Sequence, residues 1–218
     1  MPTNRGSRET RFDSRTFAVF AFSALASVLW LVRAQQAGPR FVFLWWNLLL
    51  AWIPWVLAVT LATVRARLAF WPLLAAWLAF FPNAPYLLTD LVHLKARAPV
   101  PLWFDVLFLS AFAWAGCVAG WDSLRRVHAA LEVRVGAAKA AGLVTLSVLL
   151  SGLGVFLGRF ERLNSWDVVT EPGQVATTMA DSLLEPRALL YSLAFSCFVG
   201  LGYLFTSPPE TRRAGASG

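Results

Sequence analysis

Four polar side chains are spaced so that one helix would carry them on one face. Tyr86, Asp90, His93 and Arg97 are separated by 4, 3 and 4 residues, and leucines fill half of the positions between them. Residues three or four apart are neighbours on a helix surface, and a carboxylate beside an imidazole can orient a general base or a metal-binding histidine. We therefore predict Asp90 and His93 as catalytic residues. The alternative is an interfacial helix whose polar stripe faces water.

Two further segments carry polar residues next to apolar runs. Asp105 lies just inside such a run, after Pro99 and Pro101. A carboxylate within a membrane span is costly unless it is paired or hydrated, so Asp105 indicates either function or a position near the interface. The second segment, residues 159–167, mixes cations, carboxylates, an asparagine and a tryptophan, which a snorkelling boundary explains only in part. The predicted binding residues are Asn83, Tyr86, Asp105, Arg159, Glu161, Arg162, Asn164 and Asp167.

The sequence identifies no cofactor, metal or protein partner. It contains no glycine-rich phosphate loop, GxSxG or HExxH motif, and no zinc-type run of His and Cys. Cys117 and Cys197 lie in apolar runs outside any CxxC, so we predict free thiols that behave as small hydrophobic residues. A metal-dependent version of the site would use Asp90, His93, Asp105 and Asp167.

The composition places these residues in a membrane protein. The chain has 218 residues, of which 58% are hydrophobic and 14% charged, whereas soluble domains are nearer a quarter charged. The apolar residues form runs that match the roughly 20 residues needed to cross a bilayer. The net charge of +7 comes from Lys and Arg between these runs, which indicates membrane topology. We therefore predict the lipid bilayer as the partner and no nucleic-acid binding.

The elements that position the polar residues are predicted as an all-α polytopic bundle of about six transmembrane helices. A broken helix is predicted at Pro82–Pro85, with Asn83 as the N-cap that accepts from the Tyr86 amide. The fourth span is predicted to end at Trp121, before a charged loop. A surface helix at Gln174–Glu185 would precede the last span. The predicted spans are 16–32, 41–64, the broken third element from 68, 102–121, 140–157 and 188–205, within a transmembrane domain at 16–205 that is flanked by a cytoplasmic tail at 1–15 and a disordered tail at 206–218.

The first apolar run has two interpretations. Arginines precede it and small residues at 34–37 follow it, as in a cleaved signal peptide. The run is longer than the usual apolar core of a signal peptide, and Arg33 interrupts its end, so we predict an uncleaved first span.

The distribution of Lys and Arg predicts that both termini face the cytoplasm of a bacterial inner membrane. The excess lies in the two tails and in the connections after the second and fourth spans. The predicted cytoplasmic cations are Arg5, Arg8, Arg11, Arg15, Arg65, Arg67, Arg125, Arg126, Arg134, Lys139, Arg212 and Arg213, against Arg33, Arg40, Lys95, Arg97, Arg159, Arg162 and Arg187 on the other side.

Two segments of the chain that carry polar residues resemble a known protein family. Residues 81–94, which read FPNAPYLLTDLVHL, and the later GRF at 158–160 and NSWD at 164–167 resemble the DUF1361 family of uncharacterised bacterial membrane proteins. The resemblance extends from about the second span to the sixth. It implies a multi-pass architecture and no particular activity, and it favours one outward-facing site that both segments share.

Three functions remain open from the sequence. The first is an accessory or structural membrane subunit with an outward-facing polar patch. The second is an enzyme acting on a lipid or lipid-linked substrate, with His93 as general base and Arg159 or Arg162 holding a phosphate. The third is a small-solute transporter, which the broken helix favours. An enzyme predicts that the two polar segments converge on a pocket, and a structural subunit predicts that they do not.

Overall fold

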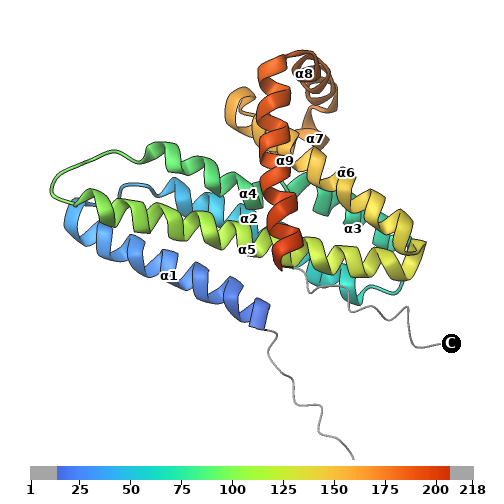
Figure 1. Ribbon diagram of the computed structural model, residues 1–218, viewed down its shortest axis with the longest axis horizontal. Coiled ribbons are helices and arrows are strands. Elements are labelled where there is room, and N and C mark those ends of the chain that lie inside the picture. The colour runs from blue at the N-terminus through green and yellow to red at the C-terminus, as the bar shows by residue number, and fades with distance from the viewer. Residues whose placement is uncertain (1–13, 207–218) are drawn as a thin grey trace, which may run out of the picture.

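The computed structural model describes residues 14–206, which are almost entirely helical (Figure 1). The predicted tails at 1–15 and 206–218 lie almost wholly outside these residues. In chain order the elements are α1 (Ser14–Ala37), α2 (Phe43–Thr63), α3 (Arg67–Phe80), α4 (Asn83–Tyr86), the 3-10 helix η1 (Leu87–His93), α5 (Leu102–Val135), α6 (Ala137–Phe156), the π-helix η2 (Leu157–Glu161), α7 (Asp167–Thr170), α8 (Pro172–Leu184) and α9 (Pro186–Thr206).

Six segments of the described chain are long and apolar enough to cross a membrane, which confirms the predicted all-α polytopic bundle. Large apolar side chains on their outer surfaces, such as Leu25, Leu149 and Leu201, are exposed. An apolar exterior of this extent is stable when the surrounding solvent is lipid. The six segments are Ser14–Ala37, Phe43–Thr63, Arg67–His93, Leu102–Val135, Ala137–Glu161 and Pro186–Thr206.

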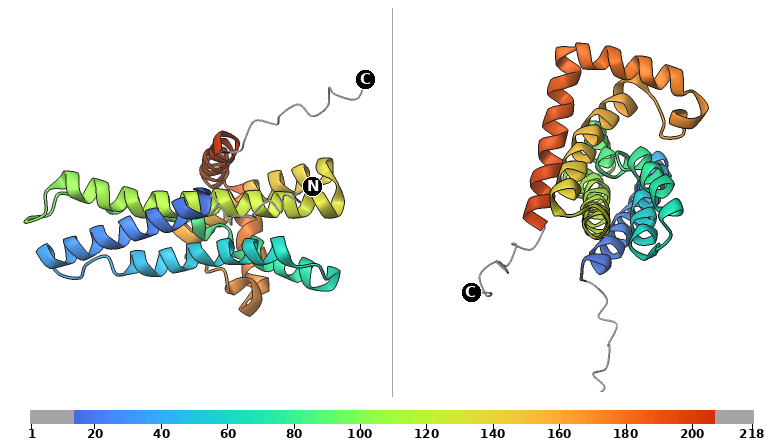
Figure 2. Two further views of the ribbon diagram at one scale, coloured as in Figure 1. Left: turned by 90° about the horizontal axis from the view of Figure 1, so that it is seen from below. Right: turned by 90° about the vertical axis from the view of Figure 1, so that its right-hand side faces the viewer.

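The longest helix, α5, runs through the middle of the molecule and contacts helices on several sides (Figures 1 and 2). Its first half packs in a buried cluster with α1 and α2 around Phe108 and Phe112. Its second half packs in another cluster with α3 and α6 around Phe70 and Trp77. Because both clusters contain residues of α5, this helix connects the two parts of the core.

The prediction that the fourth span stops at Trp121 was wrong, because α5 continues to Val135. The charged residues after Trp121 are accommodated on the helix. Asp122 is buried and accepts hydrogen bonds from Trp55 Nε1 at 2.9 Å and Arg126 Nε at 2.7 Å. A buried carboxylate with these partners does not require a water-exposed loop.

The third membrane segment is broken at Pro82–Pro85, as predicted, but the capping prediction for Asn83 was wrong. The Tyr86 amide donates to the Pro82 carbonyl at 3.1 Å, because Pro82 already has helical dihedral angles. The Asn83 side chain instead donates through Nδ2 to the Phe80 carbonyl at 2.9 Å and to Ser165 Oγ at 2.7 Å.

Of the last three helices, α9 packs along α6, and α7 and α8 lead into α9. In Figure 2, α8 extends sideways from the top of α9, over the side of the molecule that carries α2 and α3. The surface helix predicted at Gln174–Glu185 is present as Pro172–Leu184. Helix α9 crosses α6 at Gly152, where a Cβ atom would collide with the Ser192 carbonyl oxygen. The absence of a side chain at Gly152 therefore allows close helix packing.

Candidate functional site

A cavity of about 340 Å³ lies where the broken third segment meets α2, the end of α6 and the loop before α7. Two segments that are distant in the sequence, around Asn83 and around Ser165, form facing parts of its wall. Its lining mixes amide, hydroxyl and guanidinium groups with large apolar side chains. The lining residues are Trp46, Asn47, Leu50, Ala79, Pro82, Asn83, Tyr86, Gly154, Leu157, Gly158, Arg162, Leu163, Asn164, Ser165, Trp166, Val168 and Val175.

Two glycines bring the end of α6 against the broken helix. A Cβ atom at Gly154 would lie 2.5 Å from Pro82 Cγ, and one at Gly158 would lie 3.4 Å from Tyr86 Cε2. Only a residue without a side chain permits the first approach. These glycines therefore place the polar residues that follow α6 beside Pro82 and Tyr86.

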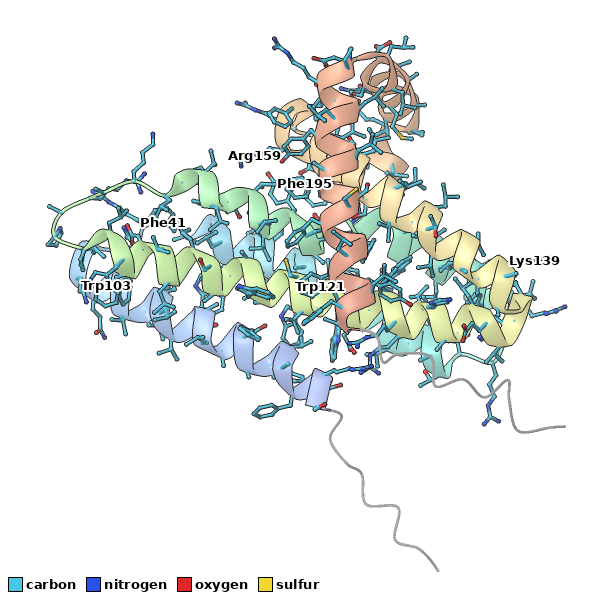
Figure 3. The ribbon with its side chains drawn as sticks, in the orientation of Figure 1. Phe41, Trp103, Trp121, Lys139, Arg159 and Phe195 are labelled. Carbon is cyan, nitrogen blue, oxygen red and sulfur yellow. The ribbon has the colours of Figure 1, made fainter. Side chains whose placement is uncertain are left out.

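The backbone after α6 departs from regular α-helix at the cavity. Residues Leu157–Glu161 form a π-helix, and Arg162 then adopts a left-handed conformation with φ of 59°. Single π-turns occur often at functional sites, and a left-handed conformation is uncommon for a residue other than glycine. This irregular turn places Arg162 in the cavity wall, whereas Arg159 projects from the end of α6 opposite to Lys139 (Figure 3).

The loop that follows is held by short polar contacts. Asn83 Nδ2 donates to Ser165 Oγ at 2.7 Å, which joins the broken helix to the loop. Asp167 Oδ2 accepts from the Asn164 backbone amide at 2.6 Å and from its side chain at 3.3 Å. Asp167 therefore shapes the loop, and its carboxylate is engaged within it.

Asp90 is buried next to the cavity and is held by two distant residues. Its Oδ2 accepts from Asn47 Nδ2 at 2.8 Å, and its Oδ1 lies 3.8 Å from Arg159 Nη1. Its exposed fraction is 2%, so the arginine supplies the charge compensation that a buried carboxylate requires. This pair brings the two predicted polar segments, around Asp90 and around Arg159, into direct contact.

His93 occupies a different position from the one its spacing predicted. Its ring packs edge-on against Phe43, with 5.0 Å between the ring centroids, and it does not line the cavity. Within residues 14–206, no hydrogen bond joins it to Asp90. The cause is the 3-10 geometry of η1, which changes the angles between side chains, and the end of this helix at His93 before Arg97.

Asp105 and Glu161 lie outside the cavity wall. Asp105 is 1% exposed and forms a buried pair with Arg33, with 2.7 Å between Arg33 Nε and Asp105 Oδ1. Glu161 is exposed to solvent. In the described part of the chain, no group of three or more His, Cys, Asp or Glu side chains could hold a metal ion. The metal-dependent arrangement of Asp90, His93, Asp105 and Asp167 is therefore not formed.

Sequence reasoning missed Asn47, although it lines the cavity and binds Asp90. A signal was present, because Asn47 is the one amide in a long apolar run of α2 and polar residues within spans are functional hints. Trp46, the residue before Asn47, also lines the cavity. Its place in the cavity wall depends on the fold and had no signal in the sequence.

The fold and the site define a multi-pass integral membrane protein with a cavity of mixed polar and apolar character. Within that class the chain belongs to the DUF1361 family, described as "Protein of unknown function (DUF1361)", whose model matches residues 46–201. The match covers every residue of the cavity wall. No curated protein and no solved structure matched the chain.

Proposed function

We propose that this membrane protein binds an amphipathic, lipid-like ligand in the cavity. The observation that carries the proposal is the division of one continuous wall into two kinds of surface. Leu50, Leu157 and Val175 provide apolar area, whereas Asn83 and Arg162 provide polar groups. Binding sites of this type combine apolar walls with a few placed polar groups.

The mouth of the cavity suits a ligand that arrives from the bilayer. Trp46 on α2 and Val168 on α7 both line the cavity and are 55% and 46% exposed. An apolar rim in a membrane protein lets a hydrocarbon chain remain in lipid while its polar end enters the protein. A cavity of about 340 Å³ is at the small end for ligand sites, which fits entry of the polar end alone.

The geometry favours binding over the enzyme predicted from Asp90 and His93. His93 packs on Phe43 outside the cavity wall, and both oxygens of Asp90 are engaged by Asn47 and Arg159. A general base must reach the proton that it removes. The transporter alternative keeps one supporting observation, since the broken helix at Pro82–Pro85 lines the cavity, and flux through proteoliposomes would test it.

The experiment compares two substitutions one turn apart on α3. Ala79→Phe fills the cavity, whereas Ala75→Phe adds the same side chain on the exposed face of the helix. The purified proteins are incubated with phosphatidylethanolamine and phosphatidylglycerol at a ratio of 3:1, and retained lipid is counted by native mass spectrometry. We expect Ala79→Phe to retain one lipid fewer than wild type and Ala75→Phe to match wild type. Equal retention by all three proteins would contradict the proposal and favour an accessory or structural subunit.

We also propose a bacterial cytoplasmic membrane, with both termini in the cytoplasm and the cavity on the outer side. The excess of Lys and Arg in the tails, in the connection after α2, in the second half of α5 and at the start of α6 supports this orientation. The pairing of Arg33 with Asp105 supports retention of α1 as an uncleaved span, because removal of α1 would leave Asp105 buried without its partner.

A further inference from the structure

We propose that the polar end of the ligand is a phosphate group, bound by Arg162 with the hydroxyl groups of Ser165 and Tyr86. This inference rests on the proposed function and names the chemistry of the same cavity. All three side chains line it, and they come from the loop after η2 and from α4.

Arg162 is the cation available for the ligand. It has no carboxylate partner among residues 14–206, whereas Asp90 pairs with Arg159 and Asp167 binds the Asn164 amide. An arginine guanidinium matches the geometry of phosphate oxygens and forms charge-assisted hydrogen bonds with them. The left-handed backbone at Arg162 directs the chain so that this side chain lines the cavity.

Two hydroxyl groups add donors beside this cation. Ser165 Oγ accepts from Asn83 Nδ2, so its own hydrogen remains to be donated, and it has no acceptor within the described residues. The Tyr86 hydroxyl likewise makes no hydrogen bond within residues 14–206, although its ring lines the cavity. Donors that lack acceptors are complementary to a ligand that is rich in acceptor oxygens. A phosphate offers such oxygens together with the negative charge that Arg162 requires.

The apolar wall distinguishes a lipid phosphate from a free one. Trp46, Leu50 and Val175 would gain nothing from inorganic phosphate or a small sugar phosphate, whereas an acyl or prenyl chain would cover them. The exposed rim at Trp46 and Val168 gives that chain a route back to the bilayer. The predicted ligand is therefore a lipid that carries a phosphate at its polar end.

The test measures thermal unfolding of the full-length protein in a non-ionic detergent with three probes. Dioleoyl phosphatidate carries chains and phosphate, dioleoylglycerol carries the chains alone, and glycerol 3-phosphate carries the phosphate alone. Arg162→Asn removes the cation, and asparagine tolerates the left-handed conformation, so the fold is preserved. Arg187→Asn is the matched control, since Arg187 is exposed and lies outside the cavity wall. Arg162→Lys tests rescue by charge.

We expect phosphatidate to bind wild type at least about tenfold more tightly than either partial probe, as one charge-assisted hydrogen bond would provide. Arg162→Asn should lose about tenfold or more in affinity for phosphatidate, Arg162→Lys should recover part of it, and Arg187→Asn should match wild type. Equal affinity for dioleoylglycerol, with no effect of Arg162→Asn, would overturn the phosphate inference and leave the amphipathic ligand standing. Equal affinity for glycerol 3-phosphate would overturn a lipid source, and binding of no probe would overturn both proposals.

Discussion

The charged side chains that are buried in this apolar molecule are each paired with a side chain of opposite charge. Arg33 and Asp105 are each 1% exposed and neutralise one another between α1 and α5, and the Arg33 guanidinium also lies over the Phe41 ring at 4.5 Å. Asp122 is neutralised in a similar way by Arg126. Asp90 differs, because it pairs with Arg159 and also accepts a hydrogen bond from Asn47, which lines the cavity.

The Arg33–Asp105 pair makes a prediction about stability. Replacing Asp105 with Leu leaves the arginine buried without its partner and should destabilise the protein by about 3–5 kcal/mol. The double variant Arg33→Leu/Asp105→Leu removes both charges and should recover most of that loss. Denaturant unfolding in detergent micelles measures all three proteins. A double variant as unstable as the single one would show that packing around these side chains, and not the unpaired charge, is responsible.

The hydrogen bond between Asn83 and Ser165 makes a second prediction at this scale. Asn83→Ala should release the loop before α7 from the broken helix, so that amide hydrogens around residues 163–170 exchange faster with solvent. Combined with Ser165→Ala in a double-mutant cycle, the coupling energy should be about 0.5–1.5 kcal/mol. A coupling energy of zero would mean that other contacts hold the loop.

Helices cross closely here where glycine removes the side chain. Gly152→Ala would push a methyl group into the Ser192 carbonyl oxygen of α9. We expect a loss of about 1–3 kcal/mol, the usual cost of overpacking. Gly142→Ala lies in the same helix with no atom within 4 Å of the new Cβ, and should be neutral or slightly stabilising. Thermal unfolding distinguishes the two, and equal effects would contradict a tight α6–α9 crossing.

The elements also show which parts of the structure were predictable. The six apolar segments and the break at Pro82–Pro85 followed from the length of the apolar runs and from proline chemistry, which are local properties. The extension of α5 past Trp121 did not follow from local properties, because Asp122 is stabilised by Trp55, which is distant in the sequence. The positions of His93 and Asn47 likewise depended on a 3-10 helix and on packing between segments, neither of which hydrophobic periodicity encodes.

At the scale of the whole molecule, α7 and α8 contribute Val168 and Val175 to the cavity wall, whereas α5 contributes no residue to it. If the connection between α5 and α6 is cytoplasmic, then α8 and the cavity face the outside, because one membrane span separates them. The orientation of the chain therefore determines which pool of lipid the cavity can reach. A labelling experiment can determine the orientation of the chain in the membrane.

The topology prediction uses two engineered cysteines in a Cys117→Ala/Cys197→Ala background. Gln174 lies in α8 and Lys139 lies at the start of α6, and both side chains are exposed. A membrane-impermeant maleimide should label Gln174→Cys in intact cells, and should label Lys139→Cys only after the membrane is opened. The physical reason is that span ends rich in Lys and Arg are retained in the cytoplasm, and the end of α5 next to Lys139 carries Arg125, Arg126 and Arg134. The reverse pattern would place the cavity on the cytoplasmic side and direct the search for its ligand to the inner leaflet.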